Sequence, residues 1–143
     1  MVEVNRISAV TLIITNMKRS CDFYSQIPGF KLVYGGSSDD SFTTYKIGDN
    51  NTSAYLNLEL NLDTNICNST HYLDRKHFGR IIFHTDDVDK LYLYFKGNSI
   101  ISNIISFENE PKDASWKERY FHIREPDGYQ LSFAMPIKQE KKY

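Results

Sequence analysis

The sequence predicts an α+β protein in which two similar βαβββ modules follow one another along a chain of 143 residues. Two observations predict this fold. In two places a β-branched, apolar run is followed by a helical pattern that opens with a capping residue, Asn16 in the first half and Asp87 in the second. Short segments separated by turn residues follow each helix, as strands require. We therefore expect a single domain over 1–143, with module 1 at about 5–62, a polar linker at 63–78 and module 2 at about 79–137.

The first module is expected to contain four strands and one helix. The apolar run 7–15 is typical of a buried strand, and Met17, Cys21 and Tyr24 form the apolar stripe of a helix over 17–26 that ends before Pro28-Gly29. Further strands are predicted at 30–34, 41–47 and 54–62. Because the last of these alternates strictly, it has one face of leucines and one polar face, made of Tyr55, Asn57, Glu59 and Asn61.

The second module repeats this order. A strand at 80–85 precedes a helix that Asp87 caps and Gly97 ends, with apolar positions at Val88, Leu91, Tyr92 and Phe95. Strands are predicted at 100–106, 119–124 and 129–135, and a loop at 111–116. Residues 125–128, Glu-Pro-Asp-Gly, are typical of a tight turn between the last two strands.

Composition excludes several classes of function. With 17 basic and 18 acidic residues the net charge is −1, so we expect neither nucleic acid nor a membrane as a partner. Cys21 and Cys67 are far apart and form no CxxC motif, which argues against a disulfide framework or a structural zinc site. The sequence has no long apolar run and no signal-peptide pattern, so a cytoplasmic location is expected. The aromatic content of 14% indicates either an aromatic core or a ring-lined cavity for a flat ligand.

Three stretches, taken in order, carry a family resemblance. They are residues 10–24 followed by Pro28-Gly29-Phe30, residues 79–89, and residues 125–131 with the hairpin Glu-Pro-Asp-Gly. Together they resemble the vicinal oxygen chelate superfamily, which includes glyoxalase I, bleomycin-resistance proteins and extradiol dioxygenases. The likeness covers about residues 7–135. It implies that the two modules form a curved mixed sheet around a cavity, and that two copies of the chain pair as a homodimer.

The resemblance also implies where a divalent metal would be bound. The usual ligands are a histidine on the first strand of each module and a glutamate near the last strand of each. The matching positions here hold Ala9, Arg80, Ser132 and either Asn57 or Glu59. Alanine has no donor atom, arginine stays protonated, and one carboxylate cannot hold a transition metal. We therefore expect no metal and no other cofactor, and Arg80 favours a carboxylate or phosphate unless it is an edge residue paired with an acid such as Glu59.

Two histidines keep a shifted site open as an alternative. His84 lies four residues after Arg80 and so shares its strand face, and His122 lies on the strand before the last hairpin. Together with Glu59 they could form a two-histidine, one-carboxylate metal site. The simpler interpretation is that both are hydrogen-bonded cavity or core histidines.

The run from Trp116 to His122 contains the remaining candidates. Trp116 and Arg119 could hold a planar acid by stacking and a charge-assisted hydrogen bond. Alternatively, Trp116 closes the cavity rim and Arg119 pairs with Glu118 or Asp113.

Three functional hypotheses follow. The favoured one is a metal-free small-molecule-binding protein that holds a planar or acidic compound in an aromatic cavity, through Asn57, Glu59, Arg80, His84, Trp116, Arg119, His122 and Ser132. The second is a glyoxalase-like lyase, isomerase or dioxygenase that uses the shifted metal site or metal-free acid–base chemistry, with Glu59, His84 and His122 as candidate catalytic residues. The third is a module that binds a protein partner and no small ligand.

Overall fold

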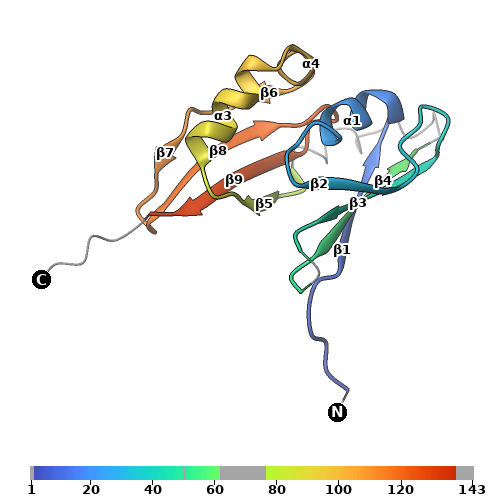
Figure 1. Cartoon of the computed structure of the whole chain (residues 1–143), viewed down its shortest axis with the longest axis horizontal. Coiled ribbons are helices and arrows are strands. Elements are labelled where there is room, and N and C mark those ends of the chain that lie inside the picture. Colours follow the sequence, from blue (N-terminus) through green and yellow to red (C-terminus); the bar gives the residue numbers. More distant parts are fainter. Residues whose placement is uncertain (1, 50, 62–76, 138–143) are drawn as a thin grey trace, which may run out of the picture. The chain divides into compact units, whose positions relative to one another are not determined.

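The computed structural model describes residues 2–49, 51–61 and 77–137 of the chain. It divides into two compact units, which we call unit 1 (residues 1–68) and unit 2 (residues 69–143). Each unit contains one mixed β-sheet and its own helices, coloured blue to green for unit 1 and yellow to red for unit 2 in Figure 1. The prediction that residues 1–143 form a single domain stays a prediction.

The described residues of unit 1 form a four-stranded sheet and one helix. Its strands lie in the order β1-β4-β3-β2, with β1 parallel to β4 and the other pairs antiparallel. The elements are β1 (Ala9–Ile14), α1 (Met17–Tyr24), β2 (Phe30–Tyr34), β3 (Phe42–Ile47) and β4 (Ala54–Leu60). This confirms the predicted strands and helix of module 1 to within a few residues.

Local sequence explains how α1 begins and which way it faces. The side chain of Asn16 accepts a hydrogen bond of 3.0 Å from the Arg19 backbone N–H, as predicted for a capping residue. The helix buries Met17, Cys21 and Tyr24, while Leu56 and Leu58 are buried on β4. The predicted alternation of β4 is confirmed, because Tyr55 and Glu59 are exposed.

Unit 2 has the same strand topology as unit 1. Its strands lie in the order β5-β9-β8-β6, with β5 parallel to β9, and the short strand β7 pairs with β8. Thus β5, β9, β8 and β6 take the places of β1, β4, β3 and β2. The elements are β5 (Arg80–His84), α3 (Val88–Gly97), α4 (Ser99–Ser102), β6 (Ser106–Phe107), β7 (Lys112–Asp113), β8 (Glu118–Arg124) and β9 (Gln130–Pro136).

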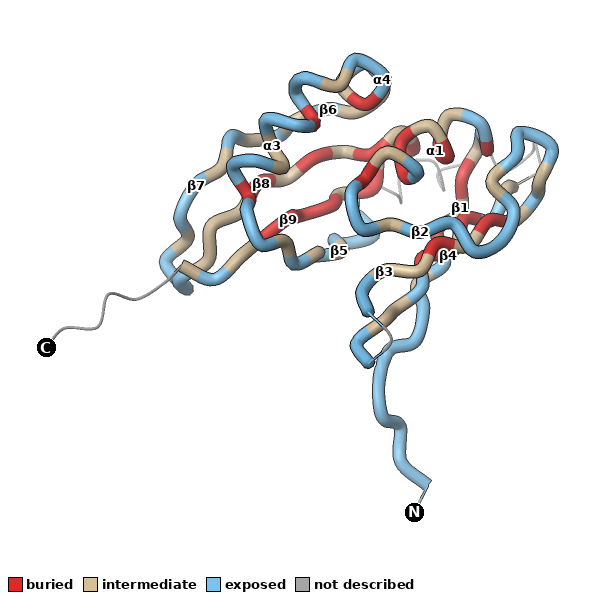
Figure 2. Tube along the Cα trace, in the orientation of Figure 1, coloured by how far each residue is buried: buried red, intermediate tan, exposed pale blue. Residues whose placement is uncertain are grey.

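Aromatic rings form the core of unit 2 between α3 and its sheet. The Phe95 ring meets those of Phe121 and Phe133 edge to face, with centroids 5.9 and 5.3 Å apart. Phe121 and Phe133 stack on each other at 5.3 Å. All three are buried, and Figure 2 shows buried residues running along both β8 and β9. Much of the aromatic content of module 2 therefore belongs to the hydrophobic core.

Two predictions about module 2 are wrong. Residues 100–106 were expected to form one strand, but α4 occupies the first part and only Ser106–Phe107 is extended. The reason is Asn98, whose side chain accepts hydrogen bonds from the backbone N–H groups of Ile100 and Ile101 and so starts a new helical turn. The predicted loop 111–116 contains β7, which adds two residues to the edge of the sheet.

Other predicted features are confirmed or lie outside the described residues. Asp87 caps α3 by accepting a hydrogen bond from the Lys90 N–H, and Gly128 closes the turn 125–128 by donating to the Glu125 carbonyl. Most of the expected linker 63–78, including Cys67, lies outside the described residues. In the part of the chain that is described, no helix is long and apolar enough to cross a membrane.

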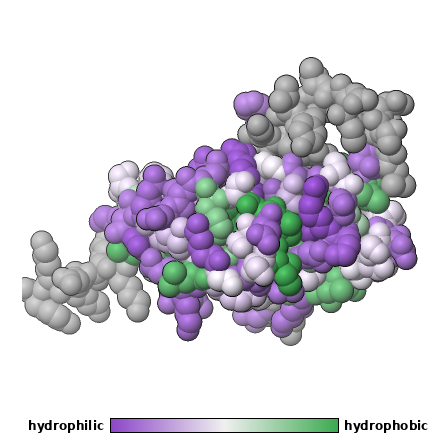
Figure 3. Space-filling view, turned by 90° about the horizontal axis from the view of Figure 1, so that it is seen from above, coloured by the Kyte–Doolittle hydropathy of each residue, from purple (hydrophilic) through white to green (hydrophobic). Residues whose placement is uncertain are grey.

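Several large apolar side chains remain at the surface. The face shown in Figure 3 is mainly hydrophilic, with apolar residues exposed in small groups. In unit 1 the exposed apolar side chains of the edge strand β2 are Leu32, Val33 and Tyr34, and in unit 2 those outside the core include Ile82, Leu93, Ile100 and Trp116.

Candidate functional site

Each sheet has one face toward its helix and one face away from it, which we call the helix-free face. Successive side chains of a strand alternate between these faces. In unit 2 the core residues Phe121, Phe133 and Leu131 mark the helix side. The helix-free face is therefore made of the residues between them, which the strand pairing places in three rows: Arg80, Gln130 and Arg124; Ile82, Ser132 and His122; His84, Ala134 and Tyr120.

Unit 1 has an equivalent face with different chemistry. Its three rows are Ala9, Tyr55 and Lys46; Thr11, Asn57 and Thr44; Ile13, Glu59 and Phe42. Because the two topologies match, Ala9 corresponds to Arg80 and Asn57 to Ser132. The pairing thus selects Asn57, rather than Glu59, as the counterpart of Ser132.

Arg80 lies at the start of β5 and is held from one side only. Its Nε donates a hydrogen bond of 2.9 Å to the Gln130 side-chain oxygen. The Gln130 amide nitrogen donates in turn to Glu108, also at 2.9 Å. The two terminal nitrogens of Arg80 make no hydrogen bond to any residue that the structure describes. Arg80 is exposed, and its pairing with Glu59, which belongs to the other unit, stays a prediction.

Arg124 is the second cation of the first row, and it is bound on several sides. Its Nε lies 3.2 Å from Glu108, and one terminal nitrogen donates to the Gly128 carbonyl at 3.2 Å. Glu108 therefore neutralises Arg124 and orients Gln130. Arg80 remains the cation of this row with donors available to a ligand.

His122 lies in the middle row beside Ser132. Its Nδ1 is buried and has no hydrogen-bond partner in the described structure. Burial lowers the pKa of His122, and the positive charge of Arg80 lowers it further, so the imidazole is neutral at pH 7. A neutral imidazole has one donor and one acceptor, which suits it to hydrogen bonding or proton transfer.

Aromatic rings extend the face beyond His122. The Tyr120 ring lies 4.7 Å from the His122 ring, and Trp116 stacks on Tyr120 with centroids 5.9 Å apart and planes 23° apart. The Lys112 ammonium lies 5.6 Å from the Tyr120 ring centroid. Trp116 is 64% exposed, so its ring is free to contact another flat group.

The turn between β7 and β8 presents Trp116. The Lys117 N–H donates to the Ala114 carbonyl at 3.0 Å, and the Ala114 N–H donates to the Glu118 carbonyl. Lys117 has a φ of 67°, a left-handed conformation that side chains other than glycine rarely adopt. Such strain is common where a turn holds a functional side chain in place.

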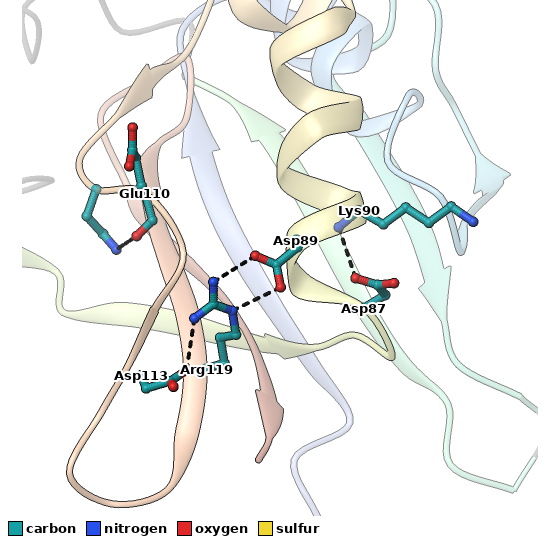
Figure 4. Close-up of polar contacts among 7 residues, drawn as sticks. Asp87, Asp89, Lys90, Glu110, Asp113 and Arg119 are labelled. Carbon is teal, nitrogen blue, oxygen red and sulfur yellow. Dashed lines mark hydrogen bonds and ion pairs between the residues drawn. The ribbon is translucent and has the colours of Figure 1, made fainter. Parts of the chain in front are cut away.

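Arg119 lies on the opposite side of the sheet from Tyr120 and His122. Its guanidinium donates two hydrogen bonds to Asp89 of α3, at 2.8 and 2.9 Å, and a third to Asp113 at 2.9 Å (Figure 4). Hydrogen bonds from Arg119 lower the pKa of Asp89. Of the two interpretations offered for Arg119, this geometry favours pairing with acids, and Asp89 is a partner that the sequence did not suggest.

His84 lies at the end of β5, on the helix-free face. Its Nε2 is 3.5 Å from a carboxylate oxygen of Asp86. Both residues border a pocket of about 750 Å³ within unit 2, lined further by Thr85, Asp87, Asp113, Arg119, Met135, Pro136 and Ile137. The lining contains three aspartates, whereas the first row of the helix-free face contains two arginines.

In unit 1 the side chain of Asn57 is already bonded to its neighbours. It accepts a hydrogen bond of 2.8 Å from the Thr44 hydroxyl and donates to Thr11 at 3.2 Å. Glu59 is exposed one row away, next to Ile13 and Phe42. The central row of this face is therefore a neutral chain of hydroxyl and amide groups.

The residues at the family's metal-ligand positions do not fit a metal. Ala9 and Arg80 have no lone pair to offer, and Ser132 and the hydrogen-bonded Asn57 are weak donors for zinc or iron. Among the described residues, no three His, Cys, Asp or Glu side chains gather around one point. The alternative site made of Glu59, His84 and His122 draws on both units and stays a prediction.

Sequence reasoning missed several residues of the helix-free face of unit 2. They are Gln130, Arg124, Tyr120 and Lys112, together with Glu108 at its edge. Period-two alternation from His122 and Ser132 already indicates the first three. Lys112 could be recognised only from the pairing of β7 with β8, and Glu108 only from its position directly after β6.

Comparison with known proteins identifies the family. Residues 6–133 match the model of the Glyoxalase/Bleomycin resistance protein/Dioxygenase superfamily. The chain belongs to this superfamily. No protein of curated function matches it.

Several solved structures share the fold of this chain at low sequence identity. A glyoxalase family protein from Bacillus cereus has a TM-score of 0.65 at 15% identity, covering 95% of this chain and 97% of the other. A superfamily member from Sphaerobacter thermophilus has a TM-score of 0.58 at 18% identity, covering 92% and 97%. TioX from Micromonospora has a TM-score of 0.61 at 14% identity, covering 93% and 100%. These likenesses confirm the predicted glyoxalase/bleomycin-resistance fold.

Proposed function

We propose that this superfamily member binds a small planar or acidic compound without a metal, on the helix-free face of unit 2. The observation that carries the proposal is Arg80. It occupies a position where the family resemblance implies a metal-binding histidine, and its terminal nitrogens have no partner among the described residues. A positive charge at that position repels a metal ion and attracts an anion.

The geometry of Arg80 suits a carboxylate. A guanidinium offers two parallel N–H donors that match the two oxygens of a carboxylate, and such charge-assisted bonds are stronger than neutral ones. No acid is within salt-bridge distance of Arg80 in the described structure, whereas Arg124 is paired with Glu108 and Arg119 with Asp89 and Asp113. A ligand carboxylate would supply the missing partner.

The rings of β8 supply the planar part of the proposed site. Tyr120 and Trp116 stack on each other, and both lie on the same side of the sheet as His122. Flat ligands gain contact area and quadrupole interactions on such rings. The central strand β9 contributes two small, buried residues, Ser132 and Ala134, to this side of the sheet. The remaining residues expected to bind ligand, Asn57 and Glu59, stay predictions.

A matched ligand series tests the proposal. The purified protein is titrated with 2-naphthoate, benzoate and quinoline-2-carboxylate, and with the uncharged amide of each. We expect the acids to raise the melting temperature and the amides not to. Arg80→Gln should weaken acid binding at least about tenfold, since a hydrogen bond to a charged group contributes roughly 1.5–3 kcal/mol.

Lys90→Gln is the control for this series. Lys90 lies on α3, at the helix side of the sheet, and its replacement removes one positive charge from the same unit. Binding should survive this change. Equal loss in both variants would mean that only net charge matters, and binding that survives Arg80→Gln would refute the role of Arg80.

A second candidate, a glyoxalase-like lyase or isomerase using metal-free acid–base chemistry, is favoured by His122. Its imidazole is neutral, its Nδ1 lacks a partner in the described residues, and Arg80 stands ready to stabilise a nearby anion. Hydrogen–deuterium exchange at C3 of an α-keto acid such as phenylpyruvate, the methylene next to the keto group, is followed by NMR and tests this candidate. Catalysed exchange that disappears in His122→Phe, with elemental analysis showing no bound metal, would favour the enzyme over the binding protein.

The assembly and location of the chain are part of the proposal as well. We propose a homodimer, since β1, β2 and β5 are edge strands of their sheets within the described residues and edge strands can pair with another chain. A cytoplasmic location stays part of the proposal. Light scattering of the purified protein checks the mass, and a monomer at every concentration would contradict the dimer.

A further inference from the structure

We propose that Gln130 is a positioning residue, which aims the Arg80 guanidinium at the ligand, and that Glu108 fixes Gln130 in the orientation this requires. The inference rests on the proposed anion site and adds to it the residues that set its geometry. It is carried by one continuous chain of hydrogen bonds, from Glu108 through Gln130 to Arg80.

The first step concerns the orientation of the Gln130 amide. An ionised carboxylate only accepts hydrogen bonds, so Glu108 requires the NH₂ end of Gln130 to face it. The oxygen of Gln130 must then face Arg80, where it accepts from Nε at 2.9 Å. A Gln130 turned the other way would bring an N–H donor against an N–H donor at Arg80 and leave Glu108 without its bond.

The second step concerns Glu108 itself. Its Oε1 lies 2.9 Å from the Gln130 nitrogen and 3.2 Å from the Nε of Arg124. The Glu108 backbone N–H donates to the His122 carbonyl at 3.0 Å. Glu108 is therefore held at both ends, its backbone by the His122 carbonyl and its carboxylate by Arg124. Arg124 is in turn anchored to the hairpin by its bond to the Gly128 carbonyl.

The third step concerns what is left at Arg80. With Nε bonded to Gln130, the two terminal nitrogens lie on the parts of the guanidinium that no described residue hydrogen-bonds. A free arginine side chain has many rotamers, and holding one of them before the ligand arrives reduces the entropy lost on binding. We therefore expect Gln130 to set affinity through Arg80 without contacting the ligand carboxylate itself.

A ligand-independent experiment tests the orientation first. In ¹⁵N NMR spectra the Arg80 Nε–H signal, assigned by its absence in Arg80→Lys, should exchange slowly with water because it is hydrogen-bonded. Gln130→Met keeps the length and shape of the side chain and removes the acceptor. Exchange of the Arg80 signal should then become at least about threefold faster, while the Arg124 signal remains protected. An unchanged Arg80 signal would overturn the positioning role.

Binding of 2-naphthoate tests the consequence. We expect Gln130→Met to weaken binding about three- to tenfold, which corresponds to the cost of ordering one long side chain. Glu108→Gln should also speed the exchange of the Arg80 Nε–H signal, since residue 108 then no longer dictates the orientation of Gln130. In an Arg80→Ala background, Gln130→Met should cause no further loss, because Gln130 acts only through Arg80. Additive losses would instead mean that Gln130 contacts the ligand, and would contradict the inference.

The two proposals fail in different ways. If the unchanged protein binds none of the planar acids, the proposed function is wrong, and the NMR exchange of Arg80 still decides whether Gln130 positions it. If acids bind and the Arg80 signal is unaffected by Gln130→Met, the anion site stands and the positioning role is wrong.

Discussion

Arg80 and Arg124 face the same side of the same sheet, yet their surroundings give them different roles. Arg124 is bound by Glu108 and by the Gly128 carbonyl, so its charge is neutralised within the fold. Arg80 is linked to that carboxylate only indirectly, because its Nε bonds to Gln130 and Gln130 bonds to Glu108. Its two terminal nitrogens have no hydrogen-bond partner among the described residues. The number of local partners, rather than residue type, marks which of the two suits an incoming anion.

The pKa of His122 makes a prediction about stability at the same scale. Because burial and the charge of Arg80 lower this pKa in the folded protein, the unfolded chain binds the proton more readily. His122 should therefore not reduce the free energy of unfolding above about pH 6.5, the ordinary pKa of histidine. As the pH drops from there toward the lowered pKa of the folded protein, the free energy of unfolding should fall. Urea unfolding at about pH 7.5 and about pH 5.5 measures the difference.

His122→Phe provides the comparison for this pH effect. Phenylalanine keeps a flat ring against Tyr120 and has no proton to bind, so the fall in stability between the two pH values should be smaller than in the unchanged protein. His84→Phe is the matched control, since His84 is largely exposed. A pH dependence that is identical in the unchanged protein and His122→Phe would show that His122 is not responsible.

At the scale of elements, Asn98 decides where two helices meet. Its backbone N–H donates to the Tyr94 carbonyl at the end of α3, and its side chain caps α4. The turn that follows buries Ile101 completely. One residue thus ends a helix, starts another and fixes the direction of the chain before β6.

We expect Asn98→Ala to destabilise unit 2 by about 1 kcal/mol, the usual effect of removing a helix cap. Asn98→Asp, which can accept the same hydrogen bonds, should restore most of the loss. Asn103→Ala, at the other end of α4, is the control because the cap there uses its backbone N–H. Denaturant unfolding checks the ranking, and a loss at Asn103 as large as at Asn98 would contradict it.

For the whole molecule, the fold could be predicted because its signals are local and occur twice. Buried strands followed by Asn16 and Asp87 caps are visible in the sequence, and both caps are present in the structure. The apolar residues at 100–101 fit either a strand or a helix, and the cap that decided between them is a single side chain. Short apolar runs of this kind are where such predictions fail.

The candidate site could be predicted only in part. Alternation along β5 and β9 correctly puts Arg80, His84 and Ser132 on one face. The partner of Arg119 could not be foreseen, because Asp89 lies 30 residues earlier and approaches only when α3 packs on the sheet. The chain from Glu108 to Arg80 likewise depends on strands that are distant in sequence.

The shared topology of the two units has a consequence for how such a protein changes over time. A chain that doubles one motif holds every position of that motif twice, and here each copy keeps its hydrophobic core on the helix side. Side chains on the other side can drift in one copy with little effect on folding. The methyl group of Ala9 and the guanidinium of Arg80 occupy equivalent places, so one half of the chain is charged at a place where the other is apolar.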